Sequence, residues 1–162
     1  MIGVLQRVSS GKVEVDAAVV GEIRGGFVVL LGVHQNDQQE DAHYLARRIA
    51  ELRVFEDPQG RMNRDLEAVG GSVLAVPQFT LLAGLRKGRR PDFLDAAEPA
   101  LGRRLFECFV DSLKQRGVTV ETGRFGATMK VTLVNEGPAT FVFDTHQLRA
   151  EPRRDSTESP TG

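Results

Sequence analysis

The segment of residues 27–33 constrains the fold most, because it is apolar along its whole length. It is short enough for a β-strand, and a strand without polar alternation is buried on both faces. Gly25 and Gly26 precede it, at a point where the chain can turn. We therefore expect this strand in the interior of the fold.

Weaker patterns predict the other strands. Alternating or continuous apolar residues predict strands at residues 2–8, 12–16, 19–23, 53–56, 72–76, 118–122, 128–134 and 140–143. Several of these segments are separated by glycine, proline or asparagine, which are typical of turns.

Two longer segments have the apolar spacing of helices. The first follows Asp37, which together with Glu40 has the spacing of a capping box. The second is predicted to begin at Asp92 or Asp95, to run to about Arg116, and to end at the glycine that follows. Many short strands with two main helices favour an α+β fold with mixed or antiparallel sheets.

The length of 162 residues suits a single compact domain. We place this domain at residues 1–146. Residues 147–162 are largely polar, contain two prolines and have no aromatic side chain. Such a segment cannot bury much apolar surface, so a disordered tail is predicted there.

The sequence contains no sign of secretion or of a membrane anchor. Cys108 is the only cysteine, which excludes an intrachain disulfide. The first residues lack the basic and apolar regions of a signal peptide, and the apolar run at residues 27–31 is too short to cross a bilayer. We therefore expect a cytoplasmic protein that does not engage a membrane.

The charge balance excludes one class of nucleic-acid-binding protein. The chain has 21 Lys and Arg residues against 22 Asp and Glu residues, a formal net charge of -1. Domains that coat nucleic acid through bulk charge are strongly basic. Any contact with RNA would have to come from a local basic patch.

The usual catalytic motifs are also missing from the sequence. The three histidines lack the spacing of a metal site, and no nucleotide-binding glycine motif or serine nucleophile motif occurs. Cys108 lies on the apolar side of a predicted helix without a nearby base, which favours a packing role. We expect no metal and no cofactor, so a catalyst here would rely on backbone groups, hydroxyls and the substrate itself.

Two short motifs are candidates for such chemistry. Val-Pro-Gln-Phe-Thr-Leu at residues 76–81 follows a predicted buried strand, where backbone N–H groups and the side chains of Gln78 and Thr80 could form an oxyanion hole. The alternative is a simple turn with Phe79 in the core. Asn-Glu-Gly-Pro-Ala-Thr at residues 135–140 suits a hairpin turn, or a rigid carbonyl-lined grip for an ammonium group if the Gly-Pro bond is cis.

Four segments in order resemble the D-aminoacyl-tRNA deacylases. They are Met-Ile-Gly-Val-Leu-Gln-Arg-Val at residues 1–8, the stretch from Gly-Gly-Ser-Val-Leu at 70–74 to Gln-Phe-Thr-Leu at 78–81, Thr-Gly-Arg-Phe at 122–125, and the 135–140 motif. The resemblance extends from Met1 to about Phe143. Each motif alone is weak, but their common order and spacing make the signal strong.

The resemblance implies a homodimer with its active site at the subunit interface. It also implies hydrolysis of the ester between a D-amino acid, or glycine, and the terminal adenosine of tRNA. By the same resemblance Gln78, Phe79 and Thr80 line the pocket and present backbone N–H groups to the ester carbonyl. Thr80 as a covalent nucleophile is the alternative, and we prefer a positioning role because no adjacent base is visible.

The remaining site residues follow from the same resemblance. Gly137 and Pro138 are expected to hold the substrate's amino group and to exclude an L side chain, with the Gly-Pro bond cis and reaching into the partner's pocket. Arg7 is expected to support them. Met129 is expected beside the pocket, although a plain core role fits it equally well.

The densest positive stretch follows the first motif. Arg86, Lys87, Arg89 and Arg90 lie within five residues, and we expect them to contact tRNA phosphates near its 3′ end. A solvated loop without a partner is the alternative.

Pro77 is a departure from the family pattern, which usually has serine there. A related branch of the fold that removes L-alanine from wrongly charged tRNA carries Pro-Gln at this point, so L-alanyl-tRNA is an alternative substrate. A third hypothesis is a non-catalytic RNA-binding module, favoured by the basic stretch and the lack of a side-chain catalyst.

Overall fold

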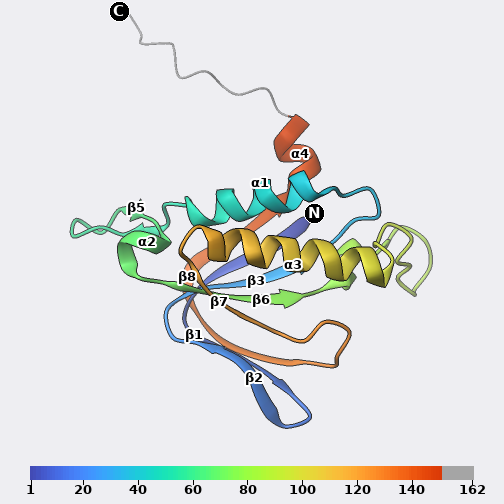
Figure 1. Ribbon diagram of the computed structural model, residues 1–162, viewed down its shortest axis with the longest axis horizontal. Helices are drawn as coiled ribbons and strands as arrows, with labels where there is room; N and C mark the ends of the chain where they lie inside the picture. Colours follow the sequence, from blue (N-terminus) through green and yellow to red (C-terminus); the bar gives the residue numbers. More distant parts are fainter. Residues whose placement is uncertain (151–162) are drawn as a thin grey trace, which may run out of the picture.

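The computed structural model describes residues 1–150 and contains one mixed sheet of six strands and a small two-stranded sheet (Figure 1). The strand order in the large sheet is β2-β1-β3-β6-β7, and β8 also pairs with β1. The elements are β1 (Ile2–Val15), β2 (Ala18–Ile23), β3 (Gly26–Gly32), α1 (Gln39–Ala50), β4 (Phe55–Glu56), β5 (Met62–Arg64), α2 (Leu66–Val69), β6 (Ser72–Pro77), η1 (Phe79–Leu82, a 3-10 helix), α3 (Pro99–Gln115), β7 (Thr119–Thr122), β8 (Lys130–Asp144) and α4 (Thr145–Ala150).

Strand β3 is buried on both faces, as its apolar sequence predicts. It pairs with β1 on one side and with β6 on the other, antiparallel and parallel respectively. Phe27 and Val29 point into the main core, whereas Val28 belongs to a second core on the opposite face. Successive side chains of a strand point to opposite faces, so both cores require apolar residues from β3.

The two long helices cover one face of the sheet. Figure 1 shows α1 and α3 side by side across it, and the two helices are in contact. Leu45 and Ile49 from α1 pack in the same core as Phe109 and Leu113 from α3, and all four are buried. This arrangement confirms the predicted α+β class with a mixed sheet and two main helices.

Both helices begin later than the sequence pattern predicts. The residue before α1 is Gln38, and its backbone N–H donates to the Asp41 carboxylate at 2.9 Å. The second helix begins at Pro99 rather than at Asp92 or Asp95, because Asp92 pairs with Gly84 in the preceding loop and the Asp95 carbonyl accepts from the Gln35 N–H. Proline suits the first turn of a helix, where its missing N–H costs nothing.

Strands β1 and β8 each join two strands that were predicted separately. They pair with one another over most of their length, and the register shifts from Val8 opposite Asn135 to Gln6 opposite Thr140. Residues 136–139 therefore bulge out of the ladder opposite Arg7, and we call them the β8 bulge. Of the two alternatives for residues 135–140, the hairpin turn is wrong, because the chain continues in the same strand.

The predicted start of the tail at residue 147 is also too early. Helix α4 runs from Thr145 to Ala150, and the remainder of the predicted tail, residues 151–162, lies outside the described residues. Within residues 1–150, no helix is both long and apolar enough to span a bilayer.

Candidate active site

A cavity of about 700 Å³ lies where β6 ends. It is bounded by β3, β6, η1, the first turns of α3 and the segment that leads into β8. Pro77, Gln78, Phe79 and Met129 line it. The structure therefore brings most of the first motif and Met129 to a single cavity, although they are separated in the sequence. Thr80 does not line this cavity, contrary to the expectation from the resemblance, because it lies one residue further into η1.

The backbone turns sharply from β6 into η1. The N–H of Gln78 donates to the carbonyl of Leu31 at 2.8 Å, so this N–H completes the ladder with β3. The N–H groups of Phe79 and Thr80 belong to the first turn of the 3-10 helix, where no acceptor exists within the helix. Of the three backbone donors expected from the sequence, Gln78 is thus already used, and Phe79 and Thr80 remain.

The side chains at this turn contact one another. Gln78 Nε2 donates a hydrogen bond to Thr80 Oγ1. An amide cannot take a proton from a hydroxyl at neutral pH, so this contact positions Thr80 and does not activate it as a nucleophile. Phe79 is 59% exposed rather than buried, and its ring packs edge-on against Phe93 at a centroid distance of 5.0 Å.

Aromatic rings form much of the remaining cavity wall. Phe93, Phe106 and Phe125 all line it, and the rings of Phe106 and Phe125 lie 6.4 Å apart. Gly102 allows Phe125 to pack against α3, because a Cβ at this position would lie 3.2 Å from Phe125 Cζ. Of these residues only Phe125 lies in a motif that the sequence singled out. Phe93 and Phe106 have the pattern of ordinary core residues, and nothing local distinguishes them.

Pro77 is the last residue of β6 and pairs with Leu31 of β3. Proline has no N–H, so Pro77 cannot donate a backbone hydrogen bond. Beyond β7, the Gly123 N–H still donates a hydrogen bond to the Ala75 carbonyl of β6, at 2.9 Å. A Cβ at Gly123 would lie 2.6 Å from Met129 Sδ and 3.5 Å from Pro77 Cδ. Pro77 and Met129 therefore both pack against Gly123, and these two side chains line the cavity.

The β8 bulge is anchored by Arg7. Arg7 is 8% exposed, and its Nε donates to the Glu136 carbonyl at 3.1 Å while its Nη1 donates to the Val54 carbonyl at 2.5 Å. The Gly137–Pro138 peptide bond within the bulge is cis, and both residues are exposed. Neither residue lines the cavity of the same chain. The structure brings Arg7 to the bulge but does not bring the bulge to its own cavity.

The basic stretch lies in an exposed loop next to the cavity. Backbone hydrogen bonds between Gly84 and Asp92, at 2.8 and 3.1 Å, close the loop at its base. Among the ion pairs within residues 1–150, none involves the four cationic residues of this stretch, Arg86, Lys87, Arg89 and Arg90. The loop is followed directly by Phe93, which lines the cavity.

Cys108 does have an imidazole beside it, contrary to the sequence-based expectation. Its Sγ lies 3.4 Å from Nε2 of His43 on α1. Burial raises the pKa of the Cys108 thiol above its ordinary value, and a hydrogen bond with the Gln39 side chain opposes this only in part. The protonated thiol is not a nucleophile, so a packing role still fits Cys108 best.

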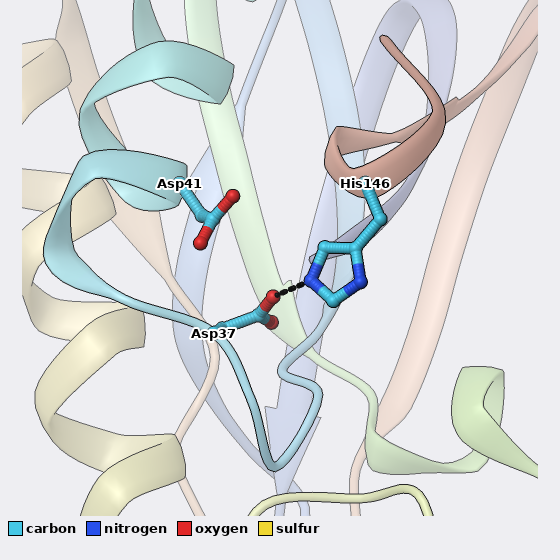
Figure 2. A group of neighbouring side chains, drawn as sticks. All are labelled: Asp37, Asp41 and His146. Atoms are coloured by element: carbon cyan, nitrogen blue, oxygen red, sulfur yellow. Dashed lines mark hydrogen bonds and ion pairs between the residues drawn. The ribbon is translucent and has the colours of Figure 1, made fainter. Parts of the chain in front are cut away.

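Asp37, Asp41 and His146 form a second group of polar side chains (Figure 2). The Met1 ammonium lies 2.6 Å from Asp37 Oδ1, and His146 Nε2 lies 2.8 Å from the same oxygen. Arg149 donates to Asp41 Oδ1 at 2.9 Å. Both carboxylates are thus already paired with positively charged groups. The group joins the start of β1 to α1 and α4, which is a structural role.

The pKa of Asp41 reflects this pairing. Burial acts to raise it, but hydrogen bonds from the Gln38 backbone N–H and from Arg149 outweigh burial and lower the pKa below its ordinary value of 3.8. A carboxyl whose pKa is lowered by folding stabilises the fold above its unfolded pKa. That contribution is present at neutral pH and is lost only as the pH falls below about 3.8.

Comparisons with known proteins agree on one family. The family model described as D-Tyr-tRNA(Tyr) deacylase matches residues 4–144. The D-aminoacyl-tRNA deacylase of Syntrophotalea carbinolica is 53% identical over 148 residues, which is 91% of this chain and 99% of that protein. The D-aminoacyl-tRNA deacylase of Thermus aquaticus is 54% identical over 147 residues, 91% of this chain and 97% of that protein.

Two solved structures are similar in fold. The c-Myc DNA Unwinding Element Binding Protein has a TM-score of 0.83 and 33% identity, with coverage of 89% of this chain and 98% of that chain. A probable eukaryotic D-amino acid tRNA deacylase has a TM-score of 0.76 and 20% identity, with coverage of 88% and 97%. The similarity to the second structure, at this identity, bears on the fold alone.

Proposed function

The chain belongs to the D-Tyr-tRNA(Tyr) deacylase family, and from this premise we propose that it hydrolyses the ester of D-aminoacyl-tRNA to free tRNA and a D-amino acid. The observation that carries the proposal is the cavity at the end of β6, where Gln78 and Phe79 meet a wall of aromatic rings. With this activity the chain is a hydrolase that acts on carboxylic esters.

The cavity has the chemistry of a site for the terminal nucleoside of tRNA. Its aromatic walls offer faces on which a base can stack, and stacking on aromatic side chains is how proteins hold unpaired bases. A nucleoside bound there would direct its ribose, and the ester on it, toward the turn at the end of β6.

The free N–H groups at that turn suit an oxyanion. In the proposed reaction, water adds to the ester carbonyl, and the N–H groups of Phe79 and Thr80 stabilise the negative charge that develops on its oxygen. The C–O bond to the ribose then breaks, and the tRNA leaves with a proton on its ribose oxygen. The neighbouring ribose hydroxyl can relay that proton, so no histidine or carboxylate of the chain is required. An aminoacyl ester is already activated, and positioning supplies much of the remaining acceleration.

The β8 bulge is the proposed selectivity element. Carbonyl groups of Gly137 and Pro138 would accept hydrogen bonds from the substrate's ammonium group and leave no room for an L side chain. A D side chain would point away from the bulge, and glycine would be accepted because it has no side chain. Arg7 supports this role, because its two hydrogen bonds tie the bulge to the chain at Val54.

A second copy of the chain would complete the site. The bulge does not line its own cavity, so a partner's bulge would have to enter it. Strand β8 also carries exposed apolar side chains, with Val134 54% and Val142 73% exposed. Exposed apolar residues grouped on one element favour a protein contact. We therefore propose a homodimer with its active sites at the interface.

Replacing Val134 and Val142 together by glutamate is expected to give a folded monomer that no longer hydrolyses D-aminoacyl-tRNA, because charges would be buried at the proposed interface. Sedimentation velocity measures the state of association, and a deacylation assay measures activity. Met62→Glu is the matched control, since Met62 is 48% exposed on the distant β5. A wild-type protein that is monomeric and fully active would contradict the proposed dimer.

The basic loop is the proposed contact for the tRNA backbone. Four cationic residues of this loop are exposed, and the loop is followed directly by Phe93, which lines the cavity and packs against Phe79: Arg86, Lys87, Arg89 and Arg90. A local patch of this kind suits a protein of net charge -1 that engages only the end of an RNA.

Pro77 favours one other substrate, L-alanyl-tRNA. Deacylation of D-Tyr-tRNA, Gly-tRNA and L-Ala-tRNA under identical conditions tests the proposal against it. We expect the first two to be hydrolysed and L-Ala-tRNA to be spared. A preference for L-Ala-tRNA would favour the alternative, and salt-dependent tRNA binding without any cleavage would identify a binding module.

A further inference from the structure

We propose that Arg103 is a substrate-binding residue that contacts the phosphodiester next to the terminal nucleoside of tRNA. The inference rests on the proposed function, because it takes the terminal nucleoside to occupy the cavity. Arg103 lies in the first turns of α3 and is exposed. In the sequence, nothing distinguishes Arg103 from an ordinary solvated arginine on a helix.

The guanidinium of Arg103 lies over a wall of the cavity. Its Cζ is 4.9 Å from the centroid of the Phe125 ring, and Phe125 lines the cavity. A cation over an aromatic face at this distance is attracted to the ring. The contact fixes the long side chain beside the cavity, where a free arginine would sample many rotamers.

This contact leaves the donors of Arg103 available. Within residues 1–150, Arg103 takes part in none of the side-chain hydrogen bonds or ion pairs, in contrast to Arg7, Arg53, Arg61 and Arg149. A guanidinium has five N–H donors in a planar fork that matches two phosphate oxygens. The stacked arginine is therefore charged, oriented and without an anionic partner.

The position also fits the shape of a nucleotide. The phosphates of a nucleotide are attached to its sugar, so a base inside the cavity leaves them at the entrance. Glu98 is the acidic residue among those that line the cavity, and it would repel a phosphate. Arg103 lies on the helix that begins directly after Glu98, and its charge would offset that repulsion and direct the phosphodiester away from Glu98.

Arg103→Gln and two substrates test this inference. The first substrate is D-Tyr-tRNA, and the second is the D-tyrosyl ester of adenosine, which has no phosphate. For D-Tyr-tRNA we expect KM to rise roughly tenfold with kcat unchanged, which is the loss expected for one charge-assisted hydrogen-bonded contact. The slope of log(kcat/KM) against log salt should become shallower by roughly 0.7. For the adenosine ester, both constants should stay at the wild-type value.

Arg104→Gln is the matched control, since Arg104 is the next residue on α3 but borders a separate groove with His43 and Cys108. It should leave both substrates unaffected, and Arg103→Lys should recover most of the lost affinity. Melting temperatures of all variants should match that of the wild type. Equal losses of Arg103→Gln on both substrates would overturn the inference and show that Arg103 only braces Phe125. An unchanged KM for D-Tyr-tRNA would overturn it too. A wild type that cleaves neither substrate would instead overturn the proposed function and the inference with it.

Discussion

Arg7→Ala is expected to lower kcat/KM for D-aminoacyl-tRNA by at least about 100-fold, which corresponds to about 2.7 kcal/mol. Arg7 is 8% exposed, and its two hydrogen bonds to backbone carbonyls hold the β8 bulge against the chain at Val54. Hydrogen bonds from a charged donor contribute roughly 1.5–3 kcal/mol each. Without them, Gly137 and Pro138 would lose the fixed position that a selectivity element requires.

Steady-state deacylation of D-Tyr-tRNA measures this effect, and circular dichroism checks that the variant remains folded. Arg61→Ala is the matched control, because Arg61 also donates a side-chain hydrogen bond, to Asp57, but is exposed and contacts neither the bulge nor Val54. It should retain wild-type activity. Arg7→Lys should be intermediate, since an ammonium cannot reach both carbonyls in the same geometry. Full activity in a folded Arg7→Ala protein would contradict the proposed role of the bulge.

Gly26→Ala is expected to lower the free energy of unfolding by at least about 3 kcal/mol. Gly26 has φ of 139°, a conformation that side chains rarely adopt. A Cβ at this position would lie 1.9 Å from the Ser72 carbonyl oxygen on the neighbouring strand. The sheet would have to separate where β3 begins to pair with β6, and β6 is the strand that leads to the Gln78–Thr80 turn.

The preceding glycine is a close control for this substitution. A Cβ at Gly25 would have no atom within 4 Å, and its φ is not positive. Gly25→Ala should therefore change the free energy of unfolding by less than about 1 kcal/mol. Urea denaturation followed by circular dichroism measures both variants. Equal stability of the two would mean that β3 and β6 do not approach as closely as described.

The sequence predicts the parts of this fold that depend on local patterns. The apolar run that forms β3 and the stripes that form α1 and α3 are encoded within single segments, and the structure confirms them. The start of α3 was predicted too early because Asp92 resembles a capping residue, whereas it pairs with Gly84 across a loop. The β8 bulge resembles a hairpin turn because both use glycine and proline, and only the pairing with β1 distinguishes them.

Some residues of the candidate site can likewise be predicted from local sequence, whereas others depend on the fold. The Gln78–Thr80 turn and the Gly137–Pro138 pair are short motifs, so they could be found from the sequence by resemblance. Phe93 and Phe106 could not, because they line the cavity only after α3 and its preceding loop pack over the end of β6. The use of the Gln78 N–H in the strand ladder likewise depends on β3, a distant segment.

The ratio of the hydrolysis rates of D-Tyr-tRNA and L-Tyr-tRNA tests the central claim most directly. Both substrates carry the same ester, tRNA and side chain, so the ratio isolates the handedness of the amino acid. We predict that the D substrate is hydrolysed at least about 100-fold faster, because an L side chain would meet the backbone of the β8 bulge. Equal rates, or no hydrolysis of either substrate by a folded dimer, would contradict the account.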